Sequence, residues 1–435
     1  MAKDDRPTAD ATEVQGEGGA GGEAERPRWK LVGPGLVVAA TGVGAPDMVA
    51  TLGAGSRYGY ELLWAVVLGV VLKIVLVEGA GRFTLATGLT IFEGWRSLGR
   101  WTTWYFGPYV MIWGFVYGAT AMSSTALPLA TLFPQLPLIA WAVLMGLLGF
   151  VMVWFNRYAT FEKISAALVG LMFVIVVGLA IVAVPNLPDL VAGLVPLVPE
   201  GGLFYTLALA GGVGGTITLA AYGYWLREKG WVTPRFMRVM RLDNTTAYVL
   251  TGVFVLAMLI VGAEVVAAAG VALSAGDAGL VDLSDVLDAR YGDVIGTAFL
   301  VGFWAAAFSS LIGVWNGVSL MFADFWGNVR GVGSGSPETR IGGRYFRFYL
   351  LWLTFPPMVL LLLDRPIGLI LVYGVLGALF MPFLAVTLLG LLNGSRVPRQ
   401  WANKWYSNVA LGFTALLFVA LGVYQVYSEV ASLLG

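Results

Sequence analysis

The chain has 435 residues, of which 58% are hydrophobic and only 12% are charged, and its mean hydropathy is +0.80. Soluble globular domains carry about 25% charged residues, so this composition excludes an ordinary soluble enzyme. It also excludes a disordered chain, which requires low hydrophobicity and high charge. Cysteine and histidine are both absent, which removes disulfides, thiolate and imidazole metal ligands and the usual proton shuttle. The composition is that of a polytopic membrane protein.

The first segment of the chain differs from the rest. Residues 1–29 are polar, rich in Gly, Ala and acidic residues, and lack apolar periodicity. This pattern predicts a disordered cytoplasmic tail, and the absence of an apolar core argues against a signal peptide. Residues 30–435 are expected to form a single transmembrane domain.

Eleven apolar stretches, each long enough to cross ~30 Å of hydrocarbon, follow the tail. They run approximately over 32–55, 58–80, 105–127, 137–155, 163–184, 203–226, 245–268, 294–322, 346–363, 366–392 and 405–427. If the N-terminus is cytoplasmic, the loops on that side contain seventeen Lys and Arg residues, against Arg57, Arg290 and Arg365 on the other side. Because basic loops stay in the cytoplasm, the N-terminus is predicted inside and the C-terminus outside. The expected location is the plasma membrane, which would be the inner membrane of a bacterium.

Two of these stretches contain residues that a continuous spanning helix avoids. The first carries residues 41–48 (TGVGAPDM) near its middle, where Pro46 removes a backbone hydrogen bond and Asp47 places a carboxylate at depth. The sixth carries residues 211–218 (GGVGGTIT) at a similar depth. Unwound backbone inside a membrane is tolerated only where it lines a cavity or is buried in protein, so both helices are predicted to be broken.

The breaks lie at matching positions of two five-helix halves, about 32–184 and 203–392, with a last helix at about 405–427. Interrupted helices at corresponding positions of two repeats indicate the substrate site of a secondary transporter. For the glycines alone, close helix packing is the simpler explanation. The residues predicted to line the site are Gly44, Ala45, Pro46, Asp47, Gly214, Gly215, Thr216 and Thr218.

Four short motifs are spread along the chain. They are Gly33-Pro34-Gly35, Tyr58-Gly59-Tyr60, Ser309-Ser310 with Gly313, and Met381-Pro382-Phe383. In these motifs and in the number of helices, the chain resembles the Nramp divalent-metal transporters over nearly its whole length after residue 30. The resemblance implies an all-α integral membrane protein with a LeuT-type inverted-repeat fold. Eleven transmembrane helices, five plus five and one more, would then be present, with helices 1 and 6 broken.

The metal-binding motifs of that family are not reproduced. Aligned on Tyr58-Gly59-Tyr60, the family's Asp-Pro-Gly-Asn motif falls on residues 44–47, so the liganding Asp is replaced by Gly44 and the Asn by Asp47. The family's Met-Pro-His motif is missing from residues 215–221, and its helix 3 acids are missing from residues 105–127. The chain is therefore interpreted as a divergent relative that has lost the usual transition-metal site.

Two kinds of substrate remain open. A small inorganic anion such as bicarbonate is the leading interpretation, because second half-helices beginning near Pro46 and Thr216 would aim N–H groups and positive dipole ends at the site. Asp47 would then cap its half-helix. The alternative is a divalent metal cation, manganese or a hydrated magnesium ion, with Asp47 as metal ligand.

The coupling ion is open as well. Asp47, Ser309 and Ser310 offer oxygens for a sodium ion. Proton coupling is an option for the metal alternative, and uncoupled facilitated transport is a third option. Lys73 and Asn316 are candidates for the transport pathway, since ionisable residues within the membrane are functional by default. The simpler explanations are that Lys73 snorkels or finds a carbonyl and that Asn316 bonds a neighbouring helix.

Other classes of protein fit less well. A channel needs a continuous polar file and an enzyme needs a constellation of titratable groups, and the apolar stretches contain neither. The chain is expected to be a transporter with no enzymatic activity, no cofactor, and no nucleic-acid or obligate protein partner. Its partners would be the lipid bilayer and the transported inorganic ion, with sodium as a further candidate.

Overall fold

The computed structural model describes residues 33–42, 44–155, 158–211, 214–270, 278–362 and 367–434, and all regular structure within these ranges is helical. This confirms the all-α prediction. The predicted tail, residues 1–29, lies outside the described residues. The α-helices are α1 (Pro34–Gly42), α2 (Ala45–Tyr58), α3 (Leu63–Thr87), α4 (Ile91–Leu98), α5 (Arg100–Leu132), α6 (Leu138–Phe155), α7 (Tyr158–Val182), α8 (Leu187–Ala192), α9 (Leu203–Gly211), α10 (Thr218–Glu228), α11 (Met237–Val261), α12 (Ala267–Ala269), α13 (Ala278–Tyr291), α14 (Asp293–Val329), α15 (Arg344–Thr354), α16 (Ile367–Leu392) and α17 (Trp405–Leu434).

Each of the eleven expected stretches coincides with helical structure, but they are not all single spans. In the described residues, eight helices are long and apolar enough to cross a membrane, and nine spans result when the bent pair α1 and α2 is taken as one. The stretch 203–226 is divided into α9 and α10, which are nine and eleven residues long. In the stretch 366–392, only Leu379–Leu392 is recognised among the described residues, as an apolar helix shorter than a membrane span.

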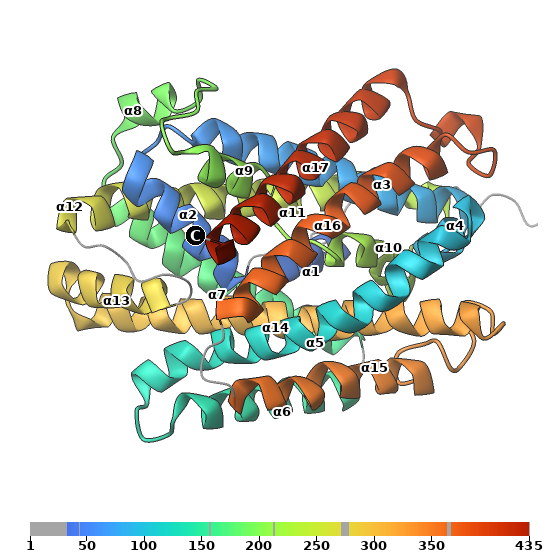
Figure 1. Ribbon diagram of the computed structural model, residues 1–435, viewed down its shortest axis with the longest axis horizontal. Coiled ribbons are helices and arrows are strands. Elements are labelled where there is room, and N and C mark those ends of the chain that lie inside the picture. Colours follow the sequence, from blue (N-terminus) through green and yellow to red (C-terminus); the bar gives the residue numbers. More distant parts are fainter. Residues whose placement is uncertain are drawn as a thin grey trace, which may run out of the picture. The chain divides into compact units, whose positions relative to one another are not determined.

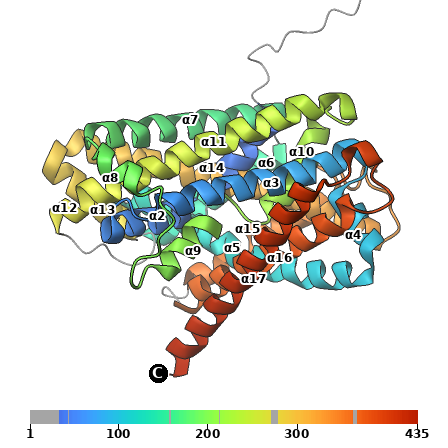
Figure 2. The same ribbon diagram turned by 90° about the horizontal axis from the view of Figure 1, so that it is seen from above.

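The 37-residue helix α14 organises the bundle. It packs against α1, α5, α7, α10, α13 and α15 (Figure 1). Helices α16 and α17 pair with each other and contact α3, and they lie side by side in Figure 1 and close together in Figure 2. Outward-facing residues such as Val174 (70% exposed) and Ile181 (69% exposed) on α7 are apolar, as expected for a surface that faces lipid.

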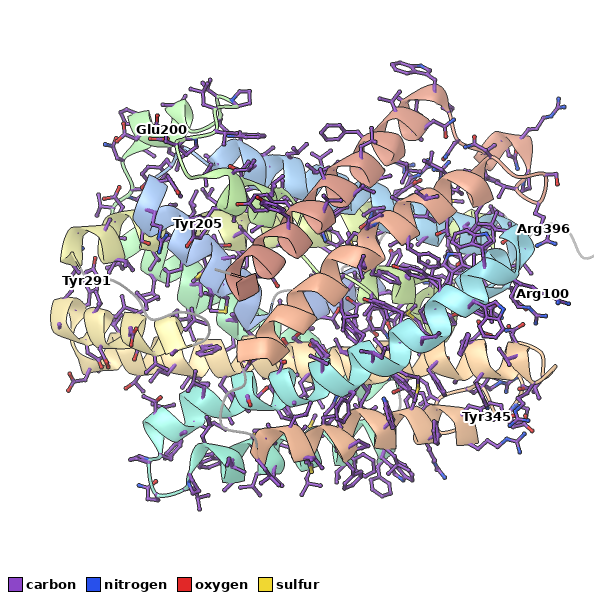
Figure 3. The ribbon with its side chains drawn as sticks, viewed as in Figure 1. Arg100, Glu200, Tyr205, Tyr291, Tyr345 and Arg396 are labelled. Carbon is purple, nitrogen blue, oxygen red and sulfur yellow. The ribbon has the colours of Figure 1, made fainter. Side chains whose placement is uncertain are left out.

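The two ends of the bundle carry different residues. Figure 3 shows Arg100, Tyr345 and Arg396 at one end and Glu200, Tyr205 and Tyr291 at the other. Arg100 and Arg396 come from two different loops that the sequence assigns to the cytoplasmic side, and they lie at the same end, as that assignment requires. The membrane side that this end faces stays a prediction.

Three helices, α4, α8 and α13, lie outside the expected apolar stretches. Helix α4 begins at a reciprocal cap, in which the Glu93 N–H donates to Thr90 Oγ1 (3.2 Å) and the Thr90 N–H donates to Glu93 Oε2 (2.8 Å), and this Thr-x-x-Glu pattern is a known helix-start signal. Helix α13 lies in the acidic segment expected as a loop, where Leu280, Leu283 and Leu287 are buried. Their spacing of three and four residues is helical, but the stretch is too polar to have been counted as a span.

The start of α1 is held by a carboxylate from another helix. Asp243, near the start of α11, accepts from the backbone N–H of Gly33 (3.2 Å) and Gly35 (2.6 Å) and from the hydroxyl of Tyr222 on α10 (3.0 Å). The first N–H groups of a helix have no partner within the helix, and a negative charge there is stabilising. Asp243 therefore fixes the half-helix that leads to the first break.

Replacing Asp243 by alanine is expected to lower the free energy of unfolding by about 1–3 kcal/mol, because buried donors lose their acceptor. Thermal unfolding in detergent, followed by intrinsic tryptophan fluorescence, measures this. The matched control is Asp189→Ala on α8, where the carboxylate accepts from Asn186 Nδ2 at an exposed position (2.7 Å). Equal melting temperatures for the two variants would contradict a structural role for the Asp243 bonds.

Candidate functional site

The first predicted break is present. Helix α1 ends at Gly42, α2 begins at Ala45, and the axes of Pro34–Gly42 and Asp47–Tyr58 differ by 61°. Ala45 and Pro46 lie in the first turn of α2, where the missing N–H of proline costs nothing. The bend at this point lets the chain cross the bundle as two half-helices.

Asp47 is the carboxylate of this break. Its Oδ2 accepts from the Gly44 N–H (3.0 Å), so Gly44 occupies the cap position and Asp47 the third helical position. The prediction that Asp47 is itself the N-cap is therefore off by three residues, although its carboxylate does bind the cap backbone. Among the described residues, Asp47 Oδ1 has no hydrogen-bond partner, and the residue is half-buried. One carboxylate oxygen is thus available to a ligand.

The second predicted break separates α9, which ends at Gly211, from α10, which begins at Thr218. Gly214 and Gly215 have φ values of +91° and +95°, a region that L side chains rarely adopt and glycine adopts freely. These two glycines are therefore required by the backbone, and their Cα hydrogens leave room for close approach.

The two breaks touch each other through glycine backbone. A Cβ added to Gly42 would lie 2.3 Å from the Gly214 carbonyl carbon and 2.4 Å from its oxygen, and one added to Gly215 would lie 3.0 Å from Gly42 Cα. Contacts this short exclude any side chain at Gly42. The predicted residues Gly214 and Gly215 thus meet Gly42 of the first break, which was not among the predicted residues.

Three carbonyls beside the breaks accept hydrogen bonds from side chains of three other helices. Gly214 O accepts from the Tyr248 hydroxyl on α11 (3.2 Å) and Gly215 O accepts from Lys73 Nζ on α3 (2.6 Å). Thr41 O accepts from Ser310 Oγ on α14 (3.0 Å), and the same hydroxyl bonds Tyr117 of α5 (3.0 Å). These hydrogen bonds therefore attach the two breaks to the helices that surround them.

Lys73, predicted to lie on the pathway, is fully buried, with 0% of its surface exposed. It does not snorkel. Besides Gly215 O, its ammonium lies 4.0 Å from Met381 Sδ and 5.4 Å from the centre of the Phe418 ring. Lys73 and Asp47 attract each other electrostatically, but they form no ion pair within 4.0 Å, in contrast to the four pairs found in the described residues.

The other predicted residues have different places. Ser309 Oγ donates to Ala306 O of its own helix (2.9 Å), whereas its neighbour Ser310 bonds Thr41 O at the first break. Asn316 Oδ1 accepts from Trp225 Nε1 (2.8 Å), which joins α14 to α10; this is the simpler of the two explanations for Asn316. Thr218 is buried, and its Oγ1 lies beside Gly215, whereas Thr216 is half-buried.

Sequence reasoning missed three contributors to the site, Gly42, Tyr117 and Tyr248. Gly42 is visible in the sequence within the first break, but only the fold shows which glycine meets the other helix. Tyr117 and Tyr248 lie in apolar stretches, where tyrosines are common at membrane interfaces. Nothing in their sequence neighbourhood marks them as partners of the breaks.

The donor set of the site is small. The described residues contain no group of three or more Asp, Glu, His or Cys side chains placed to hold a metal ion. A cation at this site would meet the carboxylate of Asp47 and otherwise backbone, hydroxyls and water. Such oxygen ligands suit hard cations rather than soft transition metals.

Comparison with known proteins matches this chain to one family. The family model described as natural resistance-associated macrophage protein-like (Nramp) matches residues 35–428. The divalent metal cation transporter MntH of Bacillus subtilis is 22% identical over 418 residues, 91% of each chain. MntH of Chromohalobacter salexigens is 28% identical over 265 residues, which are 57% of this chain and 60% of that relative. The match therefore covers less than two thirds of the relative's length.

Solved structures show the same fold. A manganese transporter of Eremococcus coleocola, crystallised with an aromatic bis-isothiourea substituted compound, gives a TM-score of 0.78 at 18% identity, covering 93% of this chain and 87% of that one. A Na⁺-coupled sialic acid symporter gives 0.54 at 13% identity, covering 91% and 89%. The LeuT-type fold implied by the sequence motifs is thereby confirmed. The chain belongs to the Nramp family, whose members are multi-pass membrane transporters.

Proposed function

We propose that the protein is a secondary transporter that carries a divalent metal cation, magnesium or manganese, through the site between its two broken helices. The observation that carries this proposal is Asp47, a carboxylate at the first break with one oxygen unbonded. Gly42 of the same break lies against the backbone of Gly214 and Gly215 in the second break. A partly exposed carboxylate attracts cations. The relatives at 22% and 28% identity are named as divalent metal cation transporters, which supports the same class.

The bicarbonate interpretation, with sodium coupling, has no support among these relatives. At the site, the carbonyls beside the breaks are hydrogen-bond acceptors, so they offer no N–H or O–H donor to an anion. The metal alternative is therefore the better proposal. We place the protein in the plasma membrane with its N-terminus in the cytoplasm, on the strength of the loop charges.

Uptake into proteoliposomes tests the proposed function. Purified protein is reconstituted, and the initial rates of magnesium and radioactive manganese uptake are measured against protein-free liposomes, with and without an inward proton gradient. Saturable uptake of at least one metal is expected, and the effect of the gradient reports proton coupling. A parallel arm supplies radioactive bicarbonate with an inward sodium gradient. Uptake of bicarbonate without uptake of either metal would overturn the proposal.

A further inference from the structure

Lys73 combines complete burial with a position at the proposed substrate site. It lies in the interior of α3, and its ammonium donates to Gly215 O at 2.6 Å. Its remaining neighbours are a thioether and an aromatic ring, which stabilise a cation only weakly. A charged side chain within a membrane is costly and is normally paired. The pairing here is with an unwound backbone carbonyl of the second break.

A metal ion without its water shell would need the oxygen of the same carbonyl as a ligand. Magnesium needs six oxygens in near-octahedral geometry when it is fully stripped of water, and it gives up water reluctantly. Gly215 O is taken by Lys73, and Gly214 O and Thr41 O already accept from Tyr248 and Ser310. In the described part of the two breaks, Asp47 Oδ1 is the carboxylate oxygen left without a partner. With these three carbonyls already engaged, a fully stripped ion would find few free oxygens among the described residues and would have to share the carbonyls' remaining lone pairs.

We propose that the Lys73 ammonium is a tethered cation that occupies the Gly215 carbonyl and thereby keeps the transported ion in its water shell. This selects a strongly hydrated divalent cation of the magnesium class over ions that bind through direct ligands. The inference rests on the proposed function, since it assigns a specificity-determining residue to the same site. Two effects act together: the ammonium removes a ligand, and its charge opposes a dehydrated metal at close range.

Substitutions at Lys73 separate charge from hydrogen bonding. Lys73→Gln retains an N–H donor for Gly215 O and loses the charge, whereas Lys73→Arg retains both. The matched control is Lys229→Gln, which removes the same charge from the Lys229–Glu162 pair (2.6 Å) away from the breaks. The readout is the apparent KM for magnesium and for manganese uptake in proteoliposomes.

Lys73→Gln is expected to lower the manganese KM by roughly tenfold or more, because the metal no longer meets a like charge, and to change the magnesium KM less. Lys73→Arg and Lys229→Gln should keep the wild-type ratio of the two KM values. Equal ratios for Lys73→Gln and Lys73→Arg would overturn the tethered-cation role while leaving metal transport intact. A wild-type protein that moves neither metal would instead refute the proposed function, on which this inference depends.

A second measurement needs no variant. Cobalt(III) hexaammine has the size and shape of a hydrated magnesium ion but does not exchange its ligands, so it binds only through its outer surface. Added to the wild-type protein, it is expected to inhibit magnesium uptake competitively. Failure to compete, at concentrations where excess unlabelled magnesium does compete, would mean that the ion sheds water at the site and that Lys73 does not preserve its shell.

Discussion

Asp47→Asn is expected to reduce metal uptake by at least about 100-fold. The amide oxygen can still accept from the Gly44 N–H, which Asp47 Oδ2 does at 3.0 Å, so the backbone of the first break should keep its shape. The charge that attracts the ion is lost, however, and a 100-fold reduction corresponds to about 2.7 kcal/mol of lost interaction. Initial rates of magnesium and manganese uptake measure the effect, with thermal unfolding to verify that the protein is folded.

Asp189→Asn is the control for this substitution. It makes the same chemical change in the exposed helix α8, and wild-type uptake is expected. Asp47→Ala adds a second comparison, because it also removes the acceptor for Gly44. If Asp47→Asn transported normally and Asp47→Ala merely lost ~1 kcal/mol of stability, Asp47 would be a structural cap and the metal proposal would lose its central residue.

Gly42→Ala is expected to abolish transport and to destabilise the protein by about 1–3 kcal/mol, the usual cost of forcing a methyl group into a packed interior. Its Cβ would lie 2.3–2.7 Å from Gly214 C, Gly214 O and Gly215 N. All three are backbone atoms of the other break, so no rotation of a side chain can relieve the overlap. Uptake assays and thermal unfolding in detergent measure the two effects.

The matched control for Gly42→Ala is Gly170→Ala. Gly170 lies in the middle of α7, and an added Cβ there meets nothing within 4 Å. Alanine is favoured over glycine within a helix by about 1 kcal/mol, so this variant should be as stable as the wild type or more stable and should transport normally. Equal behaviour of the two variants would show that the breaks can separate without loss of function.

The sequence alone predicted the helical class, the positions of the spans and both breaks. Apolar stretches of spanning length are visible directly, and Pro46 and the run of glycines around Gly214 are incompatible with a continuous helix. The number of single spans was harder to predict. Helices α9 and α10 together fill the sixth stretch, yet neither is long enough by itself. Helix α13 was missed because its apolar positions alternate with acids.

The contacts within the site could not be predicted. Lys73 and Gly215 are 142 positions apart, and Tyr248 and Gly214 are 34 apart, so only the packing of α3 and α11 against the break brings them together. Asn316 illustrates the same limit: its type allowed both a pathway role and a bond to another helix, and the position of Trp225 decides for the bond. Residue types alone do not fix the substrate either, and the anion interpretation gives too much weight to half-helix dipoles and too little to Asp47.

The opposite charges of Lys73 and Asp47 also have an electrical consequence. With both groups ionised, the empty site has no net charge, so its reorientation across the membrane is insensitive to voltage. On the proposed function, the loaded site would carry the full two charges of a divalent ion. Each charge moved through 100 mV is worth about 2.3 kcal/mol, so the inward step gains about 4.6 kcal/mol per ion at that potential. The membrane voltage alone would then drive accumulation of the ion inside the cell. The return of the empty, uncharged site would cost none of that electrical energy.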